Sequence, residues 1–108
     1  MIYSVEAIQS IVAPIARRYG IPAVYLFGSY ARGTATEHSD IDLLIDTSGT
    51  EINSLLRLGA VYTELAEALQ KPIDLITVRS LEQKTDSAHD LHFREAVKKE
   101  RMPIYVAA

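Results

Sequence analysis

The sequence centres on two short segments, Gly28-Ser29-Tyr30-Ala31-Arg32-Gly33 and Ser39-Asp40-Ile41-Asp42-Leu43-Leu44-Ile45-Asp46. The Gly-Ser pair closes one apolar run, and two acidic residues one position apart open the next. Because residues i and i+2 of a strand point to the same face, Asp40 and Asp42 direct two carboxylates toward one point. Two carboxylates at one point repel each other unless a cation lies between them. The segments therefore predict an anion-binding turn beside a divalent-metal site.

The turn itself offers the groups that hold phosphate. Gly28 lets the backbone approach a ligand closely, and Ser29 adds a hydroxyl at the start of a short helical turn over 30–33. Arg32 follows one helical turn later and is a candidate for neutralising phosphate charge. The alternatives for Arg32 are a solvated helix residue or a contact with a partner protein. Tyr30 is expected either to pack on a nucleotide or to cover the turn.

A third acidic residue extends the candidate site. Asp74 is the second residue of an otherwise apolar strand predicted over 73–78, and a buried unpaired carboxylate there would cost several kcal/mol. If this strand pairs beside the strand predicted over 40–46, Asp74 reaches the other two acids. Three carboxylates then hold two divalent cations, and oxygen ligands favour Mg²⁺ or Mn²⁺ over zinc. Two metals suit a phosphoryl-group displacement, in which Asp74 helps to deprotonate the nucleophile.

Hydrophobic periodicity predicts the helices. An amphipathic helix is expected over 4–19, begun by Ser4 and ended by Gly20, with Pro14 kinking or splitting it. A second helix is expected over 51–70. Its apolar face is predicted to consist of Ile52, Leu55, Leu56, Gly59, Tyr62, Ala66 and Leu69.

The remaining elements are a helix over 87–100, capped by Asp86 or Ser87, and four strands. The strands are predicted over 23–27, 40–46, 73–78 and 102–106. A strand, a long helix and another strand in succession indicate a parallel crossover unit. The predicted fold class is α/β (α+β), with helices packed on a small mixed β-sheet, and residues 1–108 are expected to form a single domain.

Composition limits the classes of function. Hydrophobic residues make up 48% of the 108 residues and charged residues 23%, so a packed core is expected rather than disorder. The net charge of -3 with scattered Lys and Arg shows no broad basic patch, which disfavours nucleic acid and leaves room for a small local one. The chain has no cysteine, no signal-like N-terminus and no apolar run of membrane-span length. A cytoplasmic protein without a membrane segment is expected.

The motifs resemble a known family. The pattern Leu26-Phe27-Gly28-Ser29, ten residues, then Asp40-x-Asp42, with a later lone Asp74, resembles the DNA polymerase β-type nucleotidyltransferase superfamily. The resemblance is strongest to its minimal nucleotidyltransferase branch, which includes MntA-type antitoxins, and it covers residues 4 to 106. It implies a polymerase β-like nucleotidyltransferase core with Asp40, Asp42 and Asp74 as catalytic and metal-binding residues.

The resemblance also implies an activity. Members of the family transfer a nucleoside monophosphate from a nucleoside triphosphate to a hydroxyl and release pyrophosphate. The MntA-type branch implies a Mg²⁺-dependent transfer of AMP from ATP to a tyrosine of a partner HEPN-type ribonuclease toxin. In that reading Gly28, Ser29 and Arg32 bind the nucleotide, two Mg²⁺ ions serve as cofactors, and the protein acts as an antitoxin.

Several alternatives stay open at this point. The chain could neutralise a partner by contact alone, or transfer nucleotides to RNA or to a small molecule. Asp74 could form a simple ion pair with Lys71 or Arg79. The three histidines receive no catalytic role: His89 and His92 have a spacing that can bind a metal, but a solvated helix face explains it better, and His38 lies in a polar loop. The base specificity, the acceptor residue and the oligomeric state are left open.

Overall fold

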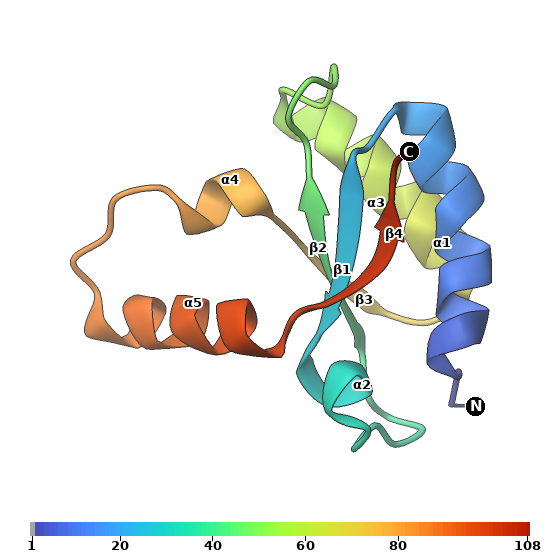
Figure 1. Ribbon diagram of the computed structural model, residues 1–108, viewed down its shortest axis with the longest axis horizontal. Helices are drawn as coiled ribbons and strands as arrows, with labels where there is room; N and C mark the ends of the chain where they lie inside the picture. Colours follow the sequence, from blue (N-terminus) through green and yellow to red (C-terminus); the bar gives the residue numbers. More distant parts are fainter. Residues whose placement is uncertain (1) are drawn as a thin grey trace.

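The computed structural model describes residues 2–108. Helices and strands alternate along the chain (Figure 1). In order they are α1 (Val5–Tyr19), β1 (Ala23–Phe27), α2 (Gly28–Arg32), β2 (Ile41–Asp46), α3 (Leu55–Leu69), β3 (Ile73–Thr77), α4 (Val78–Leu81), α5 (Ala88–Glu100) and β4 (Met102–Val106). No helix within residues 2–108 has the length and apolar character needed to cross a membrane.

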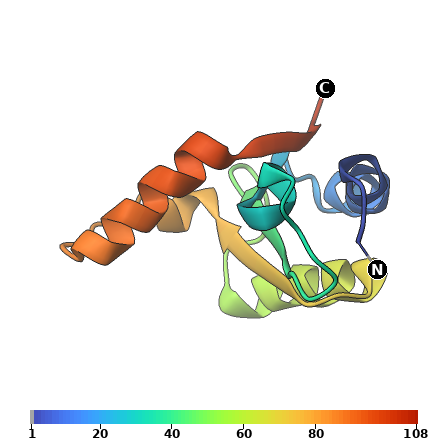
Figure 2. The ribbon, with the colours of Figure 1, turned by 90° about the horizontal axis from the view of Figure 1, so that it is seen from below.

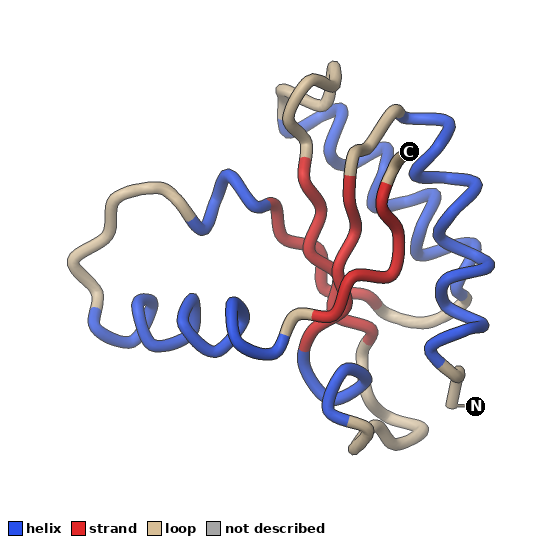
Figure 3. The backbone as a smooth tube through the Cα atoms, viewed as in Figure 1, coloured by secondary structure: helices blue, strands red, loops and turns tan. Residues whose placement is uncertain are grey.

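The four strands form one mixed sheet in the order β3-β2-β1-β4 (Figure 3). β1 pairs antiparallel with both β2 and β4, whereas β2 and β3 run parallel, joined through α3. The predicted mixed sheet, its parallel crossover unit and the terminal strand are therefore confirmed. β3 and β4 are edge strands, which matters for the exposure of the side chains they carry.

The main core lies between one face of the sheet and helices α1 and α3. Its buried side chains include Ile8, Val12, Val24, Leu26, Ile41, Leu43, Ile45, Val61, Leu65 and Leu69. A smaller cluster on the opposite face contains Phe27, Leu44, Leu81 and Val97, contributed by β1, β2, α4 and α5. The sheet is thus covered on both sides, although α5 projects away from its edge (Figure 2).

The first helix follows its predicted ends. The Ser4 hydroxyl accepts a hydrogen bond from the Ala7 amide at 3.1 Å, and Gly20 closes the helix in the left-handed conformation with φ 69°. Of the kink or split expected at Pro14, the split is wrong, because α1 runs unbroken from Val5 to Tyr19. Pro14 lies on the exposed face of the helix, so it removes one backbone hydrogen bond without disturbing the buried contacts.

The predicted start of the second helix is wrong, and its predicted apolar face is right only in part: Leu69 is buried and Ile52 and Ala66 pack against the core, whereas Leu55 and Leu56 do not. α3 begins at Leu55 after its N-cap Ser54, and it buries Val61, Leu65 and Leu69 in a row spaced by four residues. Leu55 and Leu56, which were expected to face the core, are each 86% exposed. The helix carries apolar residues on two sides, and only packing against α1 and β3 decides which side is buried.

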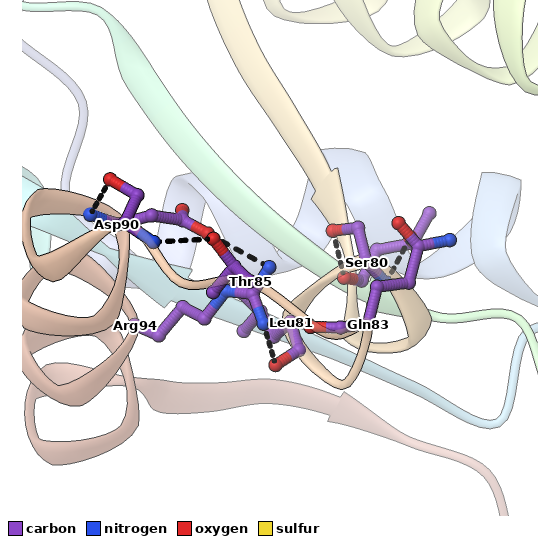
Figure 4. A network of polar contacts seen from close by, with 8 residues as sticks. Ser80, Leu81, Gln83, Thr85, Asp90 and Arg94 are labelled. Atoms are coloured by element: carbon purple, nitrogen blue, oxygen red, sulfur yellow. Dashed lines mark hydrogen bonds and ion pairs between the residues drawn. The ribbon is translucent and has the colours of Figure 1, made fainter.

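Contacts at the base of α5 hold this helix in place. Ser87 accepts a hydrogen bond from the Asp90 amide at 3.2 Å, as its predicted role as a cap requires. Arg94 donates to the carbonyl oxygens of Leu81, at 3.0 Å, and Gln83, and pairs with Asp90 at 2.9 Å (Figure 4). These contacts join α5 to α4, a four-residue helix that the sequence did not predict because a single turn is too short for an apolar period to repeat.

Candidate active site

Two neighbouring strands, β2 and β3, bring two of the three predicted acids together at one end of the sheet, and the third, Asp40, lies just before β2. In the register of β2 with β3, Asp42 lies directly opposite Asp74, and in the register of β2 with β1 it lies opposite Phe27. Residues directly opposite in adjacent strands point their side chains to the same face. Asp42 and Asp74 therefore share one face at the position where β1 ends and Gly28 begins.

The Gly-Ser turn lies against the central acid. Gly28 has φ 71°, and a Cβ atom added to it would lie 2.1 Å from Asp42 Oδ2. Only glycine combines this left-handed backbone with so close an approach. The carboxylate of Asp42 thus lies against the backbone of the predicted anion-binding turn, which gives a physical reason for glycine at position 28.

The turn leads directly into α2. The N-cap position of this helix is Phe27, which supplies no side-chain hydrogen bond to the first amides of the helix. Within residues 2–108 no partner is found for the Ser29 hydroxyl, while its carbonyl accepts from the Thr34 amide at 2.9 Å. Amides without a side-chain cap and a hydroxyl without a partner are donors that can hold the oxygen atoms of a phosphate.

The surroundings of Asp42 disfavour its charged form. Burial, followed by the negative charges of Asp74 and Asp40, raises the pKa of Asp42 to about 6. Arg32 opposes the shift, and Glu100 adds to it. Because the negative charge on Asp42 is disfavoured by its surroundings, a cation at this point would stabilise it.

The exposure of Asp74 differs from the sequence-based expectation. Asp74 is exposed, since β3 is an edge strand, so its charge needs no buried partner. Within the described residues no ion pair joins Asp74 to Arg79, which removes one of the two simple explanations for its presence. Lys71 donates to the carbonyl oxygen of Glu37 at 3.0 Å, which ties the loop before β2 to the loop before β3.

Arg32 lies at the edge of the same site. One of its guanidinium nitrogens, Nη1, donates to both carboxylate oxygens of Glu100, at 3.0 and 3.1 Å. Arg32 is also close enough to Asp42 to lower the pKa of that carboxyl. The sequence did not point to Glu100, because a partner 68 residues away on another helix leaves no local signal.

The donor set is compatible with divalent cations. Within residues 2–108 no three or more His, Asp or Glu side chains are already arranged around one point as a ready metal site. Mg²⁺ is usually held by one or two carboxylates together with water and substrate phosphates, rather than by a cage made of protein alone. Asp42 and Asp74 on one face, with the charge of Asp40 nearby, fit a cation that arrives with a nucleotide.

Other candidate residues lie away from this point. Tyr30 is 5% exposed and belongs to the main core, so it covers the turn from inside. Its hydroxyl has no hydrogen-bond partner among the described residues. His38 is exposed in the loop before β2, and His89 and His92 are exposed on α5, in agreement with the solvated reading of these two. Asp46 accepts a hydrogen bond from the Ser48 amide at 2.9 Å, so it caps a turn at the far end of β2.

Comparison with known proteins relates this geometry to a family. The profile of a family described as "Nucleotidyltransferase domain" matches residues 8–104. The chain is 37% identical over 82 residues to the protein adenylyltransferase MntA of Thermococcus cleftensis, an alignment that covers 72% of this chain and 81% of the relative.

Two solved structures share the fold. A toxin–antitoxin crystal structure with AMP-PNP superposes with a TM-score of 0.68 at 23% identity, covering 92% of this chain and 73% of the other. The structure of a tri-AMPylated HEPN toxin of Shewanella oneidensis in complex with MNT antitoxin superposes with a TM-score of 0.64 at 19% identity, and the match covers 95% of this chain and 73% of the other. The predicted polymerase β-like core and the similarity to minimal nucleotidyltransferases are confirmed.

Proposed function

The chain belongs to the nucleotidyltransferase domain family, and we propose that it transfers AMP from ATP to a tyrosine hydroxyl of a partner HEPN-type ribonuclease toxin. In this role it is an antitoxin of the MntA type. The identity to a protein adenylyltransferase supports the reaction, and the toxin–antitoxin complexes with the same fold support the partner. We assign the catalytic groups to one domain, residues 1–108, that works in the cytoplasm, where ATP is available.

The observation that carries the proposal is the contact between an acid and a phosphate-binding turn. Asp42 Oδ2 lies 2.1 Å from the position that a Cβ of Gly28 would take, and Asp74 lies on the same face of the adjacent strand. A triphosphate held by the amides of this turn would therefore lie beside the carboxylates. Such a juxtaposition positions the α-phosphorus for attack by an acceptor hydroxyl.

The reaction follows from these placements. The acceptor hydroxyl oxygen forms a bond to the α-phosphorus of ATP, the bond from that phosphorus to the β-phosphate oxygen breaks, and pyrophosphate leaves. Gly28 and Ser29 hold the outer phosphates, with Arg32 at their edge, and Asp74 accepts the proton of the hydroxyl. Asp40, Asp42 and Asp74 would hold two Mg²⁺ ions, for which Mn²⁺ is the alternative. Bound metal would neutralise phosphate charge and acidify the hydroxyl.

The experiment is an incubation of the purified protein with labelled ATP, Mg²⁺ and the toxin encoded beside it. Label is expected on the toxin protein, and the variant Asp42→Asn is expected to abolish it. Asp46→Asn is the matched control, because Asp46 lies on the same strand at the opposite end. Label retained by Asp42→Asn would contradict the assignment of the site.

The same proteins and variants distinguish this proposal from transfer to another acceptor and from neutralisation by contact alone. Label on RNA or on a small-molecule acceptor, with none on the toxin, would favour another branch of the family. Asp42→Asn is also tested in cells that express the toxin. If this variant protects the cells as well as the natural protein does, neutralisation by contact alone would replace AMP transfer as the function.

A further inference from the structure

A cavity lies at the end of the sheet opposite the acids. Its volume is about 520 Å³, and its lining includes Arg17, Arg18, Tyr19, Glu51, Ile52 and Arg57. The C-terminal end of α1 and the loop over 47–53 form this end, at the top of Figure 1, whereas α2 lies at the bottom. None of the lining residues belongs to the candidate active site.

The charge of the cavity differs from that of the whole chain. Three of the seven arginines line it together with one acid, Glu51, although the net charge of the chain is -3. The sequence shows no broad basic stripe, so this is a local concentration created by the fold. Arginine guanidinium groups bind phosphate through paired hydrogen bonds.

The arginines have hydrogen-bonding capacity to spare. Arg18 is engaged by Glu64 through two bonds of 3.1 and 2.9 Å. Arg57 has a single contact of 3.4 Å with Glu51, whose side chain is 91% exposed. Arg17 forms no ion pair within residues 2–108. Arg17 and Arg57 are therefore available to an incoming anion.

Arg57 does not stabilise the helix in which it lies. Arg17 and Arg18 lie in the last turn of α1, where cations stabilise the helix dipole. Arg57 instead lies in the first turn of α3, three residues after the N-cap Ser54, and that turn contains no acid. A cation at the positive end of a helix is unfavourable. Arg57 therefore costs helix stability, which suggests a ligand for it.

The remaining lining residues and the volume of the cavity limit the class of ligand that it can hold. Tyr19 and Ile52 are partly buried and give the cavity an aromatic and an aliphatic wall beside the guanidinium groups. The volume lies in the usual range for small-molecule sites. We propose that this cavity binds a phosphorylated small molecule of mononucleotide size, with the phosphate on Arg17 and Arg57, separately from the active site.

The test measures binding of AMP by isothermal titration in the presence of EDTA, with adenosine and inorganic phosphate as the other two probes. AMP is expected to bind and adenosine is not, because the phosphate supplies the contacts. Binding of inorganic phosphate as tight as that of AMP would show that the walls contribute nothing, and it would overturn the stated ligand size.

Variants locate the site. Arg17→Ala and Arg57→Ala are each expected to weaken AMP binding about tenfold, the loss of one charge-assisted contact. Glu51→Gln is expected to strengthen it, since it removes the competing carboxylate. Lys84→Ala, which removes the same charge elsewhere, and Ser29→Ala, at the active site, are expected to leave it unchanged. Thermal unfolding checks the fold, and Arg57→Ala is expected to be at least as stable as the natural chain.

Two results would overturn the proposal. One is AMP binding that Arg17→Ala and Arg57→Ala both retain, which would place the nucleotide elsewhere. The other is an absence of AMP binding. If a single-stranded RNA oligonucleotide then binds and these two variants lose it, the arginines form a nucleic-acid contact instead.

Discussion

Gly28 and Asp42 are in direct contact: a Cβ atom on the glycine would lie 2.1 Å from Oδ2 of the acid. The contact joins the turn that would hold phosphate to the carboxylate that would hold metal. It places both halves of the proposed site within reach of one triphosphate. Substitutions at these two positions should therefore affect activity and stability in different, separable ways.

Gly28→Ala should abolish AMP transfer and destabilise the fold, because the new methyl group and the Asp42 carboxylate need the same space. Gly33→Ala is the matched control, since Gly33 has φ 76° but nothing within 4 Å of its added Cβ. The free energy of unfolding of the control should fall by about 1–2 kcal/mol, the cost of the left-handed backbone alone, and its activity should be kept. Thermal unfolding and label transfer measure both effects, and equal losses for the two variants would refute the role of the contact.

Asp42→Asn should stabilise the metal-free protein at pH 8. Since the folded-state pKa of Asp42 is raised from 3.8 to about 6, this group favours folding below pH 3.8, and that contribution is lost as the pH rises through 6. The advantage of the variant should therefore be largest above pH 6 and shrink toward pH 4. Melting temperatures of both proteins in EDTA measure it, with Asp46→Asn as the control, and a difference independent of pH would contradict the account.

Added Mg²⁺ with AMP-PNP should raise the melting temperature of the natural chain and have little effect on Asp42→Asn. The physical reason is that metal and nucleotide bind the folded state through the acids, and ligands that bind only the folded state stabilise it. AMP-PNP in EDTA is the control for nucleotide binding without metal. An equal rise for the variant would show that Asp42 does not hold the metal.

Arg32→Ala should raise the KM for ATP about tenfold, the loss of one charge-assisted hydrogen bond, with little effect on folding. Its ion pair with Glu100 is exposed, and exposed pairs contribute at most about 1 kcal/mol. Arg18→Ala breaks a comparable exposed pair with Glu64 far from the acids and should leave the KM unchanged. Steady-state kinetics measure the KM of both variants. An unchanged KM for Arg32→Ala would mean that Arg32 serves only its ion pair with Glu100 of α5 and does not contact ATP.

Local sequence signals account for the elements that were predicted correctly. Ser4 and Gly20 define α1 through a side-chain cap and a left-handed turn, both of which depend on residue type alone. The Gly-Ser pair and the Asp-x-Asp pair indicated the candidate site in the same way, because each motif is short and chemically specific, and the structure places Gly28 against Asp42. Strand register then brought Asp74 to Asp42 as expected.

The errors arise where distant parts of the chain decide the outcome. Leu55 and Leu56 belong to an apolar pattern that fits either side of α3, and packing against α1 selected the other side. The exposure of Asp74 follows from the edge position of β3, which no local pattern encodes. The arginines of the cavity at the opposite end of the sheet come from α1 and α3, so only the folded chain brings them together.

The central claim is that Asp42 and its neighbours transfer AMP to the toxin. The most direct measurement is the intact mass of the purified toxin after incubation with the protein, ATP and Mg²⁺. The account predicts a mass increase of one AMP, or of a whole number of AMP groups, that disappears with Asp42→Asn and persists with Asp46→Asn. A toxin of unchanged mass, although it is neutralised by the natural protein, would contradict it.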